Sequence, residues 1–272
     1  MFSVVIPAYN CEKTIKRVLD SVKNQTRLDL IEEVIIINDG SKDNTDLVIE
    51  NYIAHNETLH IVYEKQENHG VSYTRNKGIR MAKSEWIALL DADDLWKKNK
   101  IERQYQTIRE NPQIVFLGAC YPMKILFNKK RKLHKLNAHQ LCIRNMPGTS
   151  TVVFRRKTGE SLGLFKETMQ YGEDINFFQK FMLKDSYYIL AEKLEEGDFD
   201  KKYYAENGLS SELYKMHLGR NKNTIELYEM GLISGIYMYL MLLMNWMKFV
   251  RCSLRKKIDI SRAKKGNANR WR

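Results

Sequence analysis

The sequence is poor in the residues that build linkers, disulfide scaffolds and repeats. Its 272 residues include only four prolines, and no Ser/Gly-rich linker or internal repeat occurs. The four cysteines lie far apart, at none of the spacings typical of metal ligands or redox pairs, so a zinc ribbon or a disulfide-rich scaffold is excluded. We expect free thiols in a reducing cytoplasm at these positions, namely Cys11, Cys120, Cys142 and Cys252.

The first residues also lack a basic start followed by a long apolar stretch, as a secretory signal would have. The chain begins directly with a strand-like apolar run. We therefore expect a cytoplasmic protein, either free in the cytoplasm or in peripheral contact with the inner face of the cell membrane.

Charge is abundant but unevenly distributed. The formal net charge is +12, and the stretch 248–272 contributes +9 of it, from ten Lys/Arg and Asp259, so the rest of the chain carries only about +3. Nucleic acid is therefore not expected as a partner, although binding by the tail alone, without any enzymatic role, is one alternative. The basic run 129–132 is typical of a solvated loop, or of a segment that attracts phosphate.

With 43% hydrophobic residues, the chain can form one α/β domain with an appendage, or two small domains. Over the first hundred residues strand patterns alternate with helix patterns, which predicts a parallel, doubly wound sheet. Asn10 is a candidate cap for the first helix, which carries the apolar stripe Ile15, Val18, Leu19 and Val22. The predicted strands are 2–6, ended by Pro7, then 33–37, 59–63 and 85–90, and the later helices are 44–54 and 72–82.

Ligands bind beyond the carboxyl ends of the strands in such sheets. Polar or unusual residues follow three of the predicted strands: Pro7-Ala8-Tyr9 after the first, Asp39 after the second, and Asp91 with Asp93 after the fourth. Their convergence at one edge of the sheet predicts a site there. Beyond Asn111 the pattern predicts strands at 114–118, 123–127, 151–154 and 187–190, a helix at 173–182, and mainly helix from 209 onward.

Asp91-Ala92-Asp93 places two carboxylates one residue apart after a buried strand. Carboxylate oxygens are ligands for hard cations such as Mg²⁺ and Mn²⁺, which share their coordination with substrate phosphates. The alternative is helix capping, in which Asp94 caps a helix that starts near Lys97. Capping accounts for one aspartate and leaves two.

Three further segments have both a functional and a structural interpretation. Asp39 is a candidate to accept a hydrogen bond from a pyrimidine N–H, but Asn-Asp-Gly-Ser is also typical turn sequence. Arg75 is a candidate to grip phosphate or base, or else belongs to a solvated helix face. Asp174, with Glu173 beside it, is either a helix cap or the general base that removes an acceptor proton.

Taken together these motifs resemble family 2 glycosyltransferases, the inverting enzymes with the GT-A nucleotide-sugar fold. The resemblance covers about residues 2–205, and the motifs are specific in combination although each is weak alone. Their order and spacing match as well, and the strings are SVVIPAYN at 3–10, INDGSKDNT at 37–45, ENHGVSYTRNKG at 67–78, LLDADD at 89–94 and YGEDINFF at 171–178.

The resemblance implies a Rossmann-like, mostly parallel sheet flanked by helices, with a nucleotide-binding half at about 1–110 and an acceptor half at about 111–205. The residue pattern predicts a helical extension with a basic tail at 206–272. It implies that the segment 146–150 faces the donor sugar and the acceptor. By the same resemblance, Pro7, Ala8, Tyr9 and Asp39 contact the nucleoside, and Arg75 and Ala92 lie near the nucleotide. Asp91 approaches the ribose or the metal, Asp93 coordinates Mn²⁺ or Mg²⁺, and Asp174 is the base beside Glu173.

The resemblance further implies single-displacement transfer of a hexose, with UDP-glucose or UDP-galactose as the expected donor. A glycan, a lipid-linked sugar or a glycoprotein is the expected acceptor. Processive members carry a Gln-x-x-Arg-Trp motif after the base, which this chain lacks, so we expect one transfer per encounter. A sugar-1-phosphate nucleotidyltransferase is one alternative, but the start of this chain lacks the glycine-rich phosphate loop typical of that class. A non-catalytic scaffold is another alternative, and the intact aspartates argue against it.

Residues 230–247 contain no charged side chain. Three interpretations remain for this stretch: a core or homo-oligomer helix, a helix on a membrane surface, and a membrane span. The basic residues from Lys248 onward suit an anionic surface.

Overall fold

A computed structural model of the chain describes residues 1–120, 132–143, 147–196 and 212–268, with side chains described as far as 256. The chain divides into two compact units, Met1–Phe199 and Asp200–Arg272, and each is described by itself. The predicted boundary at 205 and the predicted strand at 123–127 lie outside the described residues.

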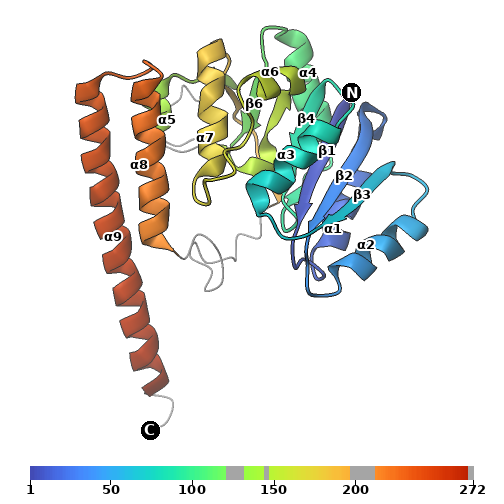
Figure 1. The fold of residues 1–272 in the computed structure, drawn as a ribbon, viewed down its shortest axis with the longest axis horizontal. Helices are drawn as coiled ribbons and strands as arrows, with labels where there is room; N and C mark the ends of the chain where they lie inside the picture. Colours follow the sequence, from blue (N-terminus) through green and yellow to red (C-terminus); the bar gives the residue numbers. More distant parts are fainter. Residues whose placement is uncertain (121–131, 144–146, 197–211, 269–272) are drawn as a thin grey trace. The chain divides into compact units, whose positions relative to one another are not determined.

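An eight-stranded sheet forms the centre of the first unit, in the order β3-β2-β1-β4-β8-β6-β9-β7 (Figure 1). β1 runs parallel to both β2 and β4, and β8 runs antiparallel between β4 and β6. A separate antiparallel pair joins β5 to β10. The strands are β1 (Phe2–Ala8), β2 (Ile31–Asp39), β3 (Ile61–Gln66), β4 (Trp86–Leu89), β5 (Leu95–Trp96), β6 (Phe116–Ala119), β7 (Leu133–Lys135), β8 (Val153–Arg155), β9 (Tyr188–Leu190) and β10 (Glu195–Glu196).

The central strands are buried on both faces, which explains why β1, β2 and β4 read as nearly continuous apolar runs. Alternate side chains of β1 point to opposite faces of the sheet. Val4 and Ile6 join a core cluster with the stripe of α1 (Ile15–Lys23). Val5 faces α3 (Val71–Met81), where a Cβ on Gly78 would lie 2.6 Å from Val5 Cγ1. Glycine therefore lets α3 approach the sheet closely.

The helices cover both faces of the sheet. Ile101 of α4 (Lys100–Glu110) joins the same cluster as α1, and Val48 of α2 (Thr45–Ala54) packs against it. On the other face, Phe177 of α7 (Glu173–Gln179) meets Phe154 of β8 edge-on, with ring centroids 5.2 Å apart. Short elements complete this unit: α5 (Ala138–Ile143), α6 (Arg156–Ser161), and the 3₁₀ helices η1 (Leu28–Leu30), η2 (Thr149–Thr151) and η3 (Lys180–Lys184).

The alternating strand and helix order and the mostly parallel sheet confirm the predicted α/β class, while three local expectations were wrong. Pro7 does not end the first strand. It lies beyond Val5, the last residue of β1 that pairs with β4, so at this point β1 has only β2 as a neighbour. Asn10 has a left-handed backbone (φ 48°) and is not the cap of α1, which begins after Thr14. Asp94 does not cap a helix near Lys97, because β5 follows it and the helix begins at Lys100.

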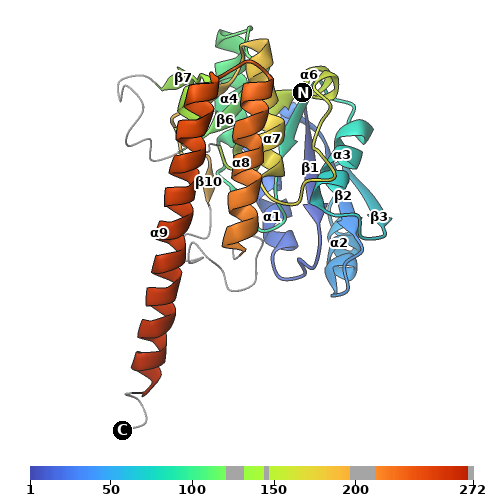
Figure 2. The ribbon, with the colours of Figure 1, turned by 60° about the vertical axis from the view of Figure 1, so that its left-hand side comes forward.

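The second unit is a helical hairpin, α8 (Leu213–Glu229) and α9 (Gly235–Ala268), whose two helices lie side by side (Figures 1 and 2). Gly231 makes the turn between them with φ 72°. This confirms the prediction that the segment beyond 209 is mainly helical, as far as the described residues 212–268 show. Over the parts of the chain that the structure describes, no helix is both long enough and apolar enough to cross a membrane.

Candidate active site

The predicted site segments lie at the carboxyl ends of the parallel strands. Ala8 and Asp39 are the last residues of β1 and β2, and Asp91 follows β4 by one residue, after Leu90. Ala8 is fully buried whereas Tyr9 is about half exposed, at 49%. Residues far apart in the sequence therefore end at one edge of the sheet, as expected for a doubly wound fold.

Asp39 is buried and holds the start of α3. Its carboxylate accepts hydrogen bonds from the backbone N–H groups of His69 (2.9 Å) and Gly70 (2.8 Å) and from Gln66 Nε2 (2.7 Å). These bonds satisfy donors at a helix N-terminus, where negative charge is stabilised. The structure thus gives Asp39 a structural role of the kind its turn sequence indicated, and its contact with a base remains a prediction.

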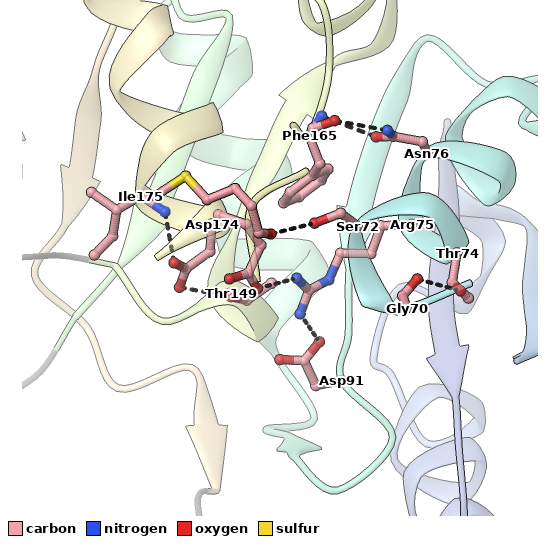
Figure 3. A network of polar contacts seen from close by, with 12 residues as sticks. Gly70, Ser72, Thr74, Arg75, Asn76, Asp91, Thr149, Phe165, Asp174 and Ile175 are labelled. Atoms are coloured by element: carbon pink, nitrogen blue, oxygen red, sulfur yellow. Dashed lines mark hydrogen bonds and ion pairs between the residues drawn. The ribbon is translucent and has the colours of Figure 1, made fainter. Parts of the chain in front are cut away.

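Arg75 lies in α3 and joins two carboxylates that are 82 residues apart (Figure 3). Its Nη2 donates to Asp91 Oδ1 at 2.7 Å, and its Nη1 donates to Glu173 Oε1 at 3.1 Å. The guanidinium also stands over the ring of Phe165, 5.3 Å from the centroid. Arg75 is buried, so the solvated helix face considered for it is wrong. Its ion pair with the buried Glu173 is little screened by solvent, whereas Asp91 is partly exposed.

The turn after β4 is fixed by a single buried hydroxyl. Ser150 Oγ accepts a hydrogen bond from the Asp91 N–H at 3.0 Å and donates one to Asp94 Oδ2 at 2.6 Å. The next residue toward the N-terminus, Thr149, lies with its Oγ1 3.4 Å from Asp174 Oδ2, and Figure 3 shows the two side chains turned toward each other. The η2 segment therefore connects the Asp91 turn to the beginning of α7.

The first turn of α7 carries two carboxylates in an unusual electrostatic setting. Burial raises the pKa of Asp174, and the nearby charge of Asp91 raises it further. Burial together with the adjacent Asp174 raises the pKa of Glu173. Asp174 Oδ1 accepts the Ile175 N–H at 2.7 Å, while Oδ2 faces Thr149. A carboxylate whose pKa is raised by burial is a stronger base when ionised, which suits proton abstraction.

Asp93 and Ala92 complete the turn. Asp93 is exposed, whereas Ala92 is buried and its carbonyl accepts a hydrogen bond from Thr14 Oγ1 at 2.7 Å. Within the described ranges, no group of three or more His, Cys, Asp and Glu side chains could hold a metal ion by itself. All four cysteines belong to the residues that the structure describes, and no disulfide joins any of them.

Sequence reasoning missed a second set of polar residues behind the Asp91 turn. Lys100 is fully buried, with its Nζ 2.7 Å from Gln104 Oε1 and 4.0 Å from the ring centroid of Trp96. Trp96 Nε1 in turn donates to the carbonyl oxygen of Ser150 at 2.7 Å. Burial lowers the pKa of Lys100 to about 7. This set contacts η2 through the carbonyl group of Ser150, whose hydroxyl contacts Asp91.

Glu195 was also missed. It lies in β10, opposite Trp96, and a Cβ added to Gly148 would come 3.4 Å from Glu195 Oε1. Burial and then the charge of Asp94 raise the pKa of Glu195 to about 7. The pairing of β5 with β10 brings Glu195 to Trp96. The only signal in the sequence was that Glu195 belongs to a short acidic segment.

Comparison with known proteins identifies the class. Solved structures that share this architecture are GT-A glycosyltransferases: S. aureus TarS 1-349 superposes with a TM-score of 0.68 at 19% identity over 92% of this chain and 73% of TarS 1-349. The mannosyltransferase PcManGT from Pyrobaculum calidifontis, solved with GDP-Man and Mn²⁺, superposes with a TM-score of 0.64 at 18% identity over 84% of this chain and 64% of PcManGT. These likenesses establish the GT-A fold.

The family follows from the sequence. The family model described as "Glycosyl transferase family 2" matches residues 3–171. The chain belongs to this family, which confirms the resemblance inferred from its motifs.

Curated relatives agree with this assignment. Glycosyltransferase GlyG of Streptococcus pneumoniae is 31% identical over 44% of this chain and 39% of GlyG. The minor teichoic acid biosynthesis protein GgaA of Bacillus subtilis is 31% identical over 69% of this chain and 44% of GgaA. The matches thus span less than half the length of these two relatives.

Proposed function

We propose that this glycosyltransferase moves a hexose from a uridine diphosphate sugar, with glucose or galactose as the sugar, to an acceptor hydroxyl by one inverting displacement. The observation that carries the proposal is Arg75, which joins Asp91, on the side of the predicted donor, to Glu173, on the side of the predicted base. A structural neighbour, TarS, has been solved with UDP-GlcNAc. N-acetylglucosamine is therefore the sugar to test beside glucose and galactose.

Each predicted site residue has a role in this proposal. Pro7, Ala8 and Tyr9 line the nucleoside pocket, and Asp39 accepts a hydrogen bond from the base while it holds the start of α3. Arg75 keeps Asp91 oriented and in addition offers positive charge near the diphosphate.

The residues of the turn suit Mn²⁺ or Mg²⁺ only when the cation is shared with the donor. Asp91 Oδ1 is engaged by Arg75, so Asp91 Oδ2 is the candidate ligand of that carboxylate. The solvent-exposed Asp93 carboxylate is the second candidate and would exchange its present contacts for the cation. One or two carboxylates with phosphate oxygens and water is the usual arrangement for such cations. When bound, the cation supplies positive charge that stabilises the departing diphosphate.

Asp174 is the proposed base. Its Oδ1 accepts the Ile175 N–H at 2.7 Å and its Oδ2 holds the longer contact with Thr149, so Oδ2 is the oxygen proposed to take the proton of the acceptor hydroxyl. As the proton leaves, the acceptor oxygen forms its bond to the anomeric carbon, and the bond from that carbon to the diphosphate oxygen breaks on the opposite face. Thr149, 3.4 Å from Oδ2, orients this oxygen toward the acceptor. Glu173 balances the charge of Arg75 beside it.

The acceptor is proposed as a glycan, a lipid-linked sugar or a glycoprotein, and the teichoic acid function printed in the name of GgaA favours a cell-envelope glycan. The nucleotidyltransferase alternative is disfavoured because its phosphate loop is missing. The scaffold alternative is disfavoured because burial raises the pKa of two adjacent carboxyls, an arrangement that a structural role does not require.

A donor screen tests the proposal. Purified protein is incubated with nucleotide sugars and Mn²⁺, hydrolysis is followed by release of the nucleoside diphosphate, and the anomeric configuration of the first product is read by NMR. We expect turnover with uridine diphosphate sugars and inversion at the anomeric carbon. Asp174→Asn should abolish turnover and Asp29→Asn, a change at an exposed carboxylate, should not. Retention of configuration, or equal turnover in Asp174→Asn, would contradict the proposal.

A further inference from the structure

The helical hairpin carries a buried polar cluster between its two helices. Between its two helices the amide of Asn245, almost fully buried, donates from Nδ2 to Asn221 Oδ1 at 3.1 Å and to Thr224 Oγ1 at 3.3 Å. His217 of α8 stacks on Phe249 of α9, with ring centroids 5.0 Å apart. Buried polar groups thus lie between the two helices, and Leu227, Met238 and Met241 of the hairpin are buried as well.

A second set of large apolar side chains lies on the surface of α9. Ile236 is 79% exposed, Tyr239 70% and Leu243 55%. At about 100° per residue, these three side chains and the four further exposed apolar side chains of α9 fall within a stripe about 120° wide on one side of the helix. We call this set the outer stripe of α9, and its exposed members are Ile236, Tyr239, Leu240, Leu243, Trp246, Met247 and Leu254.

Cations and aromatic rings border the outer stripe on opposite sides. Arg251 follows Met247 by four residues and lies at one border of the stripe, and Arg255, four residues further, lies on the same side but farther round the helix. Tyr239 and Trp246, seven residues apart, occupy the other border. Amphipathic rings and long cationic side chains both favour the zone between hydrocarbon and water.

The charge of this surface decides between a membrane and a second copy of the chain. Residues 235–256 of α9 carry Lys248, Arg251, Arg255 and Lys256 and no acidic residue. If two copies packed their outer stripes in parallel, these cations would come together and repel each other. If the copies packed antiparallel, the cations of one copy would face the apolar first turns of α9 in the other copy. An anionic bilayer surface matches both the apolar stripe and the cations.

We propose that the outer stripe of α9 docks flat on the surface of an anionic phospholipid bilayer. In this arrangement the apolar side chains enter the boundary of the acyl chains and the bordering arginines contact lipid phosphates. The proposal concerns the hairpin and does not depend on the donor or on the base.

Vesicle binding of the full chain tests it. Cosedimentation is measured with vesicles of phosphatidylcholine alone and of phosphatidylcholine mixed with phosphatidylglycerol. We expect binding to the mixed vesicles that is weakened by salt, and a loss of about tenfold or more in Leu243→Glu with Trp246→Glu. The matched control is Leu47→Glu in α2, because Leu47 is 57% exposed and thus comparable to Leu243.

Charge and insertion are tested separately. Arg251→Glu with Arg255→Glu should reduce binding to the mixed vesicles, and Lys13→Glu with Arg17→Glu, two exposed cations of the first unit, should reduce it much less. Trp246→Phe should keep binding but lose the quenching of tryptophan fluorescence by brominated lipid, a readout that misfolding would not imitate. Hydrolysis of a soluble donor sugar should be unchanged in all these variants, which separates this proposal from the proposed function.

Two results would overturn the inference. The first is a full chain that ignores mixed vesicles. The second is a full chain that is dimeric by light scattering and is made monomeric by Leu243→Glu with Trp246→Glu, since a second copy would then be the occupant of the outer stripe.

Discussion

The hydroxyl of Ser150 lies 2.6 Å from Asp94 Oδ2 and donates to it, while it accepts the N–H of Asp91. Ser150→Ala removes both bonds and leaves buried polar groups unsatisfied. We expect unfolding to become easier by about 1–3 kcal/mol, together with a higher KM for the donor because the Asp91 turn loosens. Denaturant unfolding and steady-state kinetics measure the two effects. Ser161→Ala, at an exposed serine, is the control, and an unchanged KM in Ser150→Ala would contradict this role.

Arg75 is expected to matter for stability as much as for activity. Arg75→Met leaves Asp91 and Glu173 without their shared counter-charge in a buried setting, and losing one partner of such a pair costs about 3–5 kcal/mol. Arg80→Met, an exposed position in the same helix, should change the free energy of unfolding by less than about 0.5 kcal/mol. Chemical denaturation measures both. Equal effects of the two substitutions would show that the ion pairs contribute nothing.

Asp93 is expected to affect cation-dependent binding without affecting stability. Because its side chain is exposed, Asp93→Asn should leave the melting temperature unchanged. Uridine diphosphate affinity in the presence of Mn²⁺ should fall about tenfold or more, equivalent to about 1.4 kcal/mol or more, whereas affinity in the presence of a chelator should not change. Isothermal titration calorimetry measures both. Undiminished affinity with Mn²⁺ would remove Asp93 from the proposed cation site.

The pH dependence of transfer should reflect the carboxyl pair at the start of α7. Burial raises the pKa of Asp174, so its carboxylate takes up a proton at a higher pH than an exposed aspartate does, and the rate should fall on acidification already in that range. The sign for stability is opposite, because protonation relieves the buried charge and favours the folded state as pH falls. Profiles of kcat/KM against pH report the value for the pair as a whole.

A second variant sharpens this test. Glu173→Gln removes the carboxylate adjacent to Asp174 in the sequence and should move the acidic limb of the profile to lower pH, provided that thermal unfolding shows an intact fold. An acidic limb in the ordinary range of aspartate for both proteins would argue against Asp174 as the base.

Lys100 should make the stability of the protein rise with pH above neutrality. Burial lowers its pKa from 10.5 to about 7, so between these values the unfolded chain binds a proton that the folded chain does not. Stability therefore increases over this window, by up to about 1.4 kcal/mol per pH unit. The pKa of Glu195 is raised to about 7, so its effect on stability falls at pH values below this window. Lys100→Met should flatten the rise, while Lys98→Met, at an exposed lysine, should retain it, as followed by denaturant unfolding.

Much of the fold could be predicted because its signals are local. The apolar stripe of α1 has helical spacing, and the buried parallel strands read as apolar runs, so both were predicted near their observed positions. The extension of β1 through Pro7 was not predictable, since it depends on how far β4 pairs along the other side. Asn10 looked like a helix cap, but its side chain instead accepts the N–H of Lys42, 32 residues away.

The site was predictable in its residues and not in its contacts. The motifs named Arg75, Asp91 and Asp174, yet only the packing of α7 against the sheet brings Glu173 to Arg75, 98 residues away. Lys100 and Glu195 escaped notice because their environment is created by the pairing of β5 with β10. Burial of a charged group depends on such long-range packing, and a polar residue in a helix pattern gives no local sign of it.

The place of β8 in the sheet has a consequence for any attempt to isolate the nucleotide-binding half. β8 covers the outer edge of β4 although some sixty residues separate them in the chain, and it runs against its neighbours. A fragment ending near residue 110 would present the backbone of β4 to solvent as an unprotected, apolar edge, the kind of surface that recruits other strands. Such a fragment should self-associate, so donor recognition in this protein is best studied with both halves present.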